Sequence, residues 1–103
     1  MSYSTAREDL VNTAKAMLDG KLHLIEGCRR ICDLRLRIDD SENPAFLPIR
    51  SVESETDHFP LGKLRDQCAP DYLSRSDEEM KNYLAEARED ILAACREVLR
   101  VFS

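Results

Sequence analysis

The end of the chain constrains the fold most, because apolar residues recur there at alternating spacings of four and three. This period matches one face of an α-helix, and Ser76 followed by Glu79 is typical of a helix start. The spacing predicts one helix over 77–102, roughly 40 Å long. Its apolar face must be covered by the rest of the chain or by a second copy. That face comprises Met80, Leu84, Ala87, Ile91, Ala94, Val98 and Val101, beside a second seam of Leu92, Cys95, Leu99 and Phe102.

Two shorter helices are predicted before it. Segment 5–18 carries a single apolar face and is followed by Gly20, a natural helix end. Segment 21–37 carries two adjacent apolar seams, which indicates a central helix. The 103 residues include only 3 Gly, 4 Pro and 6% aromatics, so helices are favoured over strands and tight turns. The length fits a single helical domain over 1–103.

The helical period disappears over 39–75, where all four prolines lie. We expect an ordered, irregular connection with short helical turns. Phe46, Leu47, Ile49 and Val52 suggest a short extended stretch, and residues 60–68 suggest a short helix with Leu61 and Leu64 facing inward. A connection of this length in a small domain is often functional. The sequence therefore predicts an all-α fold, a small helical bundle with two N-terminal helices, a long loop and a long C-terminal helix.

Charge and composition exclude several classes of partner. Against 20 Asp and Glu there are 15 Lys and Arg, a net charge of −5, which disfavours nucleic acid and anionic lipid. No apolar run approaches the roughly 20 residues of a membrane span. The first residues lack the basic and apolar regions of a signal peptide, so a cytoplasmic location is expected.

The four cysteines are expected to be reduced and structural. Cys28 and Cys32 belong to the apolar seams of segment 21–37, where a thiol behaves as a small buried hydrophobe. A zinc site would recruit the cysteines with His23 and His58, but the paired spacing of zinc ligands is missing. No metal and no cofactor are predicted. The remaining cysteines are Cys68 and Cys95.

The densest group of polar residues is segment 51–58. One interpretation is that its side chains cap local turns and face water. A second makes Glu55, Asp57 and His58 a polar recognition surface. A third combines Asp57 and His58 with Ser54 or Cys68 for catalysis, although no glycine-flanked serine or phosphate loop supports it.

Opposite charges in neighbouring segments suggest an internal contact. Segment 21–38 carries five basic and two acidic residues, whereas segment 39–59 carries six acidic residues and Arg50. We expect the second segment to fold back on the first and form ion pairs. The expected partners are Glu53, Glu55 and Asp57 with Arg29, Arg30 or Arg35.

The stretch from Ser54 to Gly62, with Arg65 after it, resembles a family of small, mostly uncharacterised bacterial proteins. Its most specific part is Ser-Glu-Thr-Asp followed by Pro-x-Gly. The resemblance extends to 24–29 and 94–96, and so covers roughly 22–98. It implies no activity, but it marks Glu55, Asp57, Gly62 and Arg65 as positions to examine.

Three functional hypotheses follow. The first is a non-enzymatic protein-binding module of the bacterial cytoplasm, of the small acidic immunity-protein type, with Glu55, Asp57, His58 and Arg65 in its binding surface. The second is a small hydrolase or metal-dependent enzyme that uses Asp57 and His58. The third is a structural homodimer, formed through the C-terminal helix, without a ligand.

Overall fold

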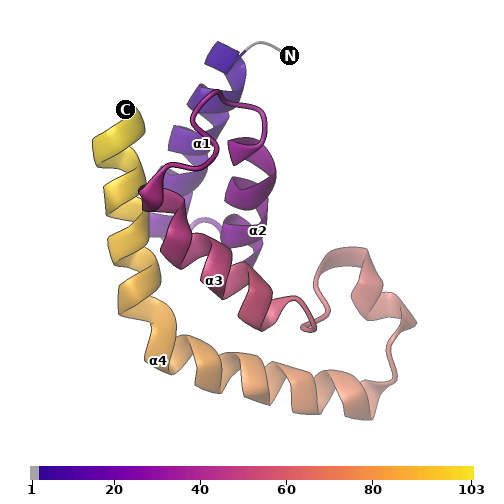
Figure 1. Cartoon of the computed structure of the whole chain (residues 1–103). Coiled ribbons are helices and arrows are strands. Elements are labelled where there is room, and N and C mark those ends of the chain that lie inside the picture. The colour runs from indigo at the N-terminus through magenta and orange to yellow at the C-terminus, as the bar shows by residue number, and fades with distance from the viewer. Residues whose placement is uncertain (1–2) are drawn as a thin grey trace.

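The computed structural model describes residues 3–103, and within that range it contains helices and no strand. This confirms the all-α fold. The bundle of Figure 1 is formed by the first three α-helices and the C-terminal half of the last one, whose N-terminal half runs along the bottom of the view. The α-helices are α1 (Tyr3–Leu18), α2 (Leu24–Arg35), α3 (Leu47–Thr56) and α4 (Pro70–Phe102), and the 3₁₀ turns are η1 (Pro44–Phe46) and η2 (Gly62–Gln67).

The main core lies between α1, α2, α3 and the C-terminal half of α4. Helices α1 and α4 run antiparallel, since Arg7 Nε near the start of α1 donates to the Phe102 carbonyl at the end of α4, at 2.9 Å. The Phe102 ring stacks on Phe46, with 5.2 Å between the ring centroids. Ile91 and Val98 are almost completely buried. The predicted apolar face is therefore confirmed, and in this half of α4 the chain itself covers it.

Helix α4 starts earlier than the sequence indicated. It begins at Pro70, because proline suits the first turn of a helix, where no intrahelical bond needs its nitrogen. Ser76, the expected cap, lies inside the helix and is buried. Straight, its 33 residues would span roughly 50 Å, yet the longest extent of the molecule is 42 Å. Figure 1 shows the bend. The helix contains neither glycine nor a second proline, and nothing in its sequence marks the bend.

Residues 46–52 are helical, so the expected extended stretch is wrong. Pro44 opens η1, where the Asn43 side chain accepts from the Ala45 amide at 2.9 Å, and Pro48 lies in the first turn of α3. Both prolines occupy positions where a missing N–H costs nothing. The buried face of α3 comprises Ile49, Val52 and Thr56. Segment 39–75 is consequently more ordered and more helical than the prolines suggested.

Helix α2 begins at Leu24, after the expected residue 21, because His23 Nδ1 accepts from the Ile25 amide at 3.2 Å and caps the helix. Gly27 lets α1 and α2 approach closely. A Cβ at this position would lie 2.3 Å from Met17 Sδ, inside any normal contact. The glycine in the middle of a helix is thus explained by packing.

A second, smaller core joins the N-terminal half of α4 and the connection after α3 to the bundle. It consists of Ile25 from α2, Phe59 from the connection after α3, and Met80 from the N-terminal half of α4. Leu61 packs against this cluster, but Leu64 is 55% exposed, contrary to its expected inward position. The short helix expected over 60–68 is the 3₁₀ turn η2.

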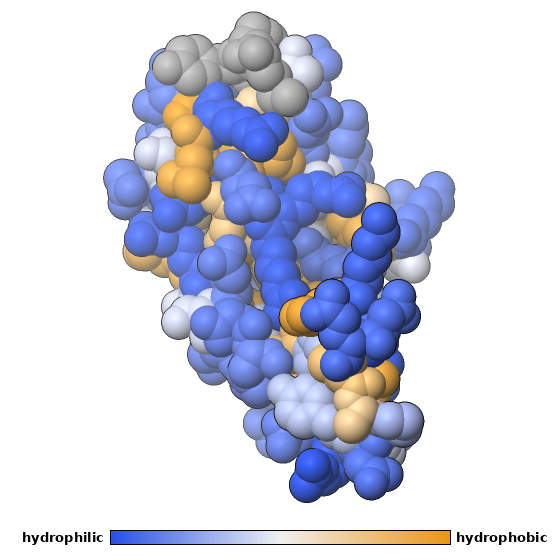
Figure 2. Space-filling model, turned by 90° about the vertical axis from the view of Figure 1, so that its right-hand side faces the viewer, coloured by the Kyte–Doolittle hydropathy of each residue, from blue (hydrophilic) through white to orange (hydrophobic). Residues whose placement is uncertain are grey.

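The exterior is mostly hydrophilic on the side that includes the connection between α3 and α4. Figure 2 shows this face, where hydrophobic side chains gather in small, separate patches. Over residues 3–103, no helix combines the length and apolar character of a membrane span.

Candidate binding groove between α3 and α4

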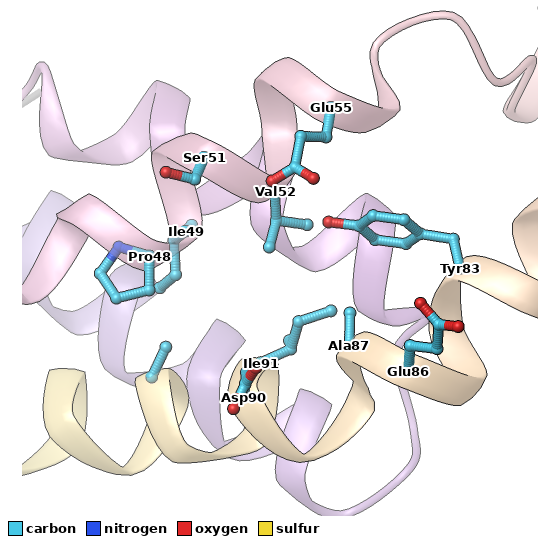
Figure 3. A pocket seen from close by; sticks show the side chains of 11 residues that line it. Pro48, Ile49, Ser51, Val52, Glu55, Tyr83, Glu86, Ala87, Asp90 and Ile91 are labelled. Atoms are coloured by element: carbon cyan, nitrogen blue, oxygen red, sulfur yellow. The ribbon is translucent and has the colours of Figure 1, made fainter.

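A hollow of about 470 Å³ lies between α3 and α4. Its floor is apolar, with Val52 from α3 and Ala87 and Ile91 from α4. Figure 3 shows both helices contributing side chains to it. We call this hollow the α3–α4 groove. It is lined by Pro48, Ile49, Ser51, Val52, Glu55, Tyr83, Glu86, Ala87, Asp90, Ile91 and Ala94.

The charged residues of the groove are all acidic. Glu55 comes from α3, and Glu86 and Asp90 come from α4. Glu86 and Asp90 are four residues apart, as are Ser51 and Glu55, and this spacing puts each pair on one face of its helix. The described residues that line the groove include no Lys, Arg or His. The groove therefore carries a concentrated negative charge beside an apolar floor.

Tyr83 extends from the α4 side of the groove toward the α3 side. Its ring extends from α4 across the groove, with the hydroxyl directed toward Glu55 (Figure 3). Burial raises the pKa of the Tyr83 hydroxyl, and the charge of Glu55 raises it further. The phenol therefore stays protonated and can donate a hydrogen bond into the groove.

The structure separates the residues that the sequence grouped as a binding surface. Glu55 lies in the α3–α4 groove, and Asp57 is exposed at the end of α3. His58 is exposed beyond it, with its ring 4.2 Å from that of Phe59 and its Nε2 atom 3.9 Å from Glu79 Oε2. His58 lines a different hollow of about 300 Å³, with Tyr72, Arg75, Ser76 and Glu79.

Arg65 holds η2 on α4. Its two terminal nitrogens donate to both carboxylate oxygens of Asp77, at 2.7 and 2.8 Å, and Nη1 also reaches the Pro60 carbonyl at 3.4 Å. The hydrogen bonds from Arg65 lower the pKa of the Asp77 carboxyl. Gly62 begins η2 with a φ of +60°, a conformation that glycine adopts without strain. Arg65 and Gly62 thus shape the connection between α3 and α4.

The expected ion pairs of Arg29 and Arg35 with Glu53, Glu55 or Asp57 are wrong. Arg29 Nη2 donates to the carbonyls of Thr56 and Phe59, at 2.6 and 3.0 Å. The Thr56 carbonyl ends α3 and carries the partial negative charge of a helix C-terminus, and it also accepts from the Phe59 amide at 3.1 Å. The Phe59 carbonyl lies in the connection after the helix, so both acceptors are backbone groups where the chain leaves α3.

Arg35 also contacts the acidic segment 39–59, but at residues other than the expected ones. It donates to the Ser41 carbonyl at 2.7 Å and pairs with Glu42 at 3.6 Å. Arg30 lines an exposed hollow together with Asp33. The acidic segment does fold back on α2, but backbone carbonyls and Glu42 make the contacts.

Three of the four cysteines are core residues, as predicted. Burial raises the pKa of the Cys28 and Cys32 thiols to about 12 and that of Cys95 to about 11. The Cys95 sulfur lies 3.7 Å from the sulfur of Met17. Cys68 is half-buried and, like the others, unpaired. From residue 3 onward, no three His, Cys, Asp or Glu side chains are grouped as a metal site.

Comparison with known proteins identifies the family. A family model described as "Protein of unknown function (DUF2489)" matches residues 2–98. The chain belongs to the DUF2489 family. This match includes α1, which lies outside the resemblance found in the sequence. No curated protein and no solved structure matches the chain.

The sequence pointed to Glu55 but not to the residues opposite it. Tyr83, Glu86 and Asp90 alternate with the apolar seam of α4 and look like an ordinary solvated face. The available signal was the matched spacing of Ser51 with Glu55 and of Glu86 with Asp90. Its meaning depends on how α3 crosses α4, which spacing alone does not give.

Proposed function

We propose that this DUF2489 protein is a non-enzymatic protein-binding module of the bacterial cytoplasm, and that it binds its partner in the α3–α4 groove. The observation that carries the proposal is the groove itself, a hollow between two helices with an apolar floor and polar edges. Helix grooves of this composition are a common way to hold a segment of another protein.

The contacts of the other polar groups support a binding role over catalysis. Arg29 and Arg65 are engaged in holding the connection between α3 and α4. The Cys28 and Cys95 thiols are fully buried, with a pKa of about 12 and about 11, so neither supplies a thiolate nucleophile. The acidic groove and the net charge of −5 also suit an immunity-type protein that neutralises a positively charged toxin.

Site-specific photo-crosslinking in the native host tests the proposal. A photoreactive residue at Ser51, exposed at the groove, should capture one protein, and the same residue at Ala93, exposed on α4 away from the groove, should not. The captured protein, purified and mixed with the unmodified chain, should form a complex of fixed stoichiometry by native mass spectrometry. Capture from both positions alike, or no reconstituted complex, would contradict the proposed function.

A further inference from the structure

We infer that the occupant of the α3–α4 groove is a positively charged segment of the partner protein, with an arginine or lysine side chain lying along the groove. This inference rests on the proposed function and specifies the partner's chemistry. It follows from the charges at the groove, from the fact that the described residues form no ion pair with them, and from the apolar floor between them.

The acids of the groove differ from the acids of this protein that form ion pairs with arginine. In the described part of the chain, Glu42, Asp77 and Glu97 each pair with an arginine. Glu55, Glu86 and Asp90 lie at one hollow and have no such pair. Like charges held close together repel, and a cation placed between them removes that repulsion. The groove is therefore electrostatically complementary to a cation.

The floor of the groove specifies what kind of cation fits. Val52 and Ala87 offer apolar surface to an alkyl stem, and arginine and lysine are the side chains that combine such a stem with a charged end. A guanidinium forms paired hydrogen bonds with carboxylates such as Glu86. The ring of Tyr83 adds an aromatic surface on which a guanidinium can stack.

Within the described residues, the hollow that holds two arginines does not match the groove in charge. Two arginines, Arg30 of α2 and Arg37 just after it, lie at one open hollow, and they share it with Asp9 and Asp33. Two acids beside two bases leave that surface without net charge. The observations thus favour a different protein that presents a basic segment.

Titration of the isotope-labelled protein with an acetylated and amidated hexa-arginine peptide tests this. At low ionic strength, NMR shifts should concentrate in the amides of 48–55 and 83–94, and hexa-glutamate should produce none. Shifts spread over the whole acidic surface would overturn the inference. Concentration-dependent self-association through the same amides would also overturn it, because a second copy would then occupy the groove.

A pair of charge-matched variants supplies the control. Glu86→Gln with Asp90→Asn removes two groove charges, whereas Glu78→Gln with Glu89→Gln removes two exposed charges of α4 outside it. The first should weaken hexa-arginine binding at least about fivefold, and the second by less than about twofold. Equal weakening would show that only net charge matters. If spermidine bound the groove as tightly as the peptide, the ligand would be a small polyamine, and the inference would fail.

The partner found by crosslinking separates the two claims. A stoichiometric complex that the groove variant does not weaken would leave the proposed function intact and refute the basic segment. Selective hexa-arginine binding, with no protein captured from Ser51, would instead refute the protein-binding function.

Discussion

Replacement of Arg29 by methionine should destabilise the protein by about 2 to 4 kcal/mol. The guanidinium donates from one nitrogen to two carbonyls, Thr56 O at 2.6 Å and Phe59 O at 3.0 Å, and these bonds join α2 to the end of α3. A hydrogen bond that involves a charged group contributes about 1.5 to 3 kcal/mol. The side chain is only partly buried, so water can reach part of the site, and the total should lie below the sum of two full contributions.

Urea unfolding followed by circular dichroism measures this difference. Arg30→Met is the matched control, since Arg30 is the next residue of α2, carries the same charge and is exposed. It should change the free energy of unfolding by less than about 0.5 kcal/mol.

Hydrogen exchange adds a local measurement. With Arg29→Met, the amides of 57–61 should exchange faster than those of the α1–α2 pair, because the connection after α3 loses its attachment first. If the two variants had equal stability and equal exchange, Arg29 would not hold the connection, and the description of this segment would be refuted.

Three further outcomes are expected. Burial raises the Cys28 pKa from 9.0 to about 12, so the unfolded chain loses that proton first as pH rises, and Cys28 alone should lower stability above pH 9 by about 1 kcal/mol per pH unit. The buried Cys32 and Cys95 thiols steepen the fall, and Cys28→Ala should reduce the slope in urea titrations by the share of Cys28. A thiol reagent at pH 8 should label Cys68 first in the folded protein, since the other thiols are buried. Cys68→Ser should remove this fast labelling phase. Rapid labelling that persists in the variant would place another thiol at the surface. The hydrogen bonds from Arg65 lower the Asp77 pKa, so carbon NMR should find this carboxyl titrating below its ordinary range. Arg65→Gln should raise the Asp77 pKa again. An unchanged titration in this variant would exclude the contact in solution.

The helices and most of the core could be predicted from the sequence because they depend on local spacing. The seam from Met80 to Val101 has the helical period, and its members pack against one of the two cores, Met80 in the smaller one. Helix α3 is not predicted from the sequence because Pro44 and Pro48 indicate an extended or irregular segment, although both prolines occupy first turns in the structure. A proline's position relative to a helix start decides whether it breaks or begins a helix.

The site depends on long-range geometry, and so less of it could be predicted. Glu55 was singled out from local composition, but its neighbours in the groove are Tyr83 and Glu86, about thirty residues later in the chain. The bend of α4 leaves no mark in the sequence. Charge is visible in a sequence and predicts pairs of arginines with carboxylates, whereas the two carbonyls that bind Arg29 come together only where the chain turns after Thr56.

The most direct test of the central claim is the affinity of the two charge-matched variants for the purified partner. Isothermal titration should show that Glu86→Gln with Asp90→Asn binds at least about tenfold more weakly than the unmodified chain, and that Glu78→Gln with Glu89→Gln binds within about twofold of it. Raising the salt concentration should narrow the difference, because exposed charges are screened. Equal affinity of the two variants would contradict a basic segment held in the α3–α4 groove.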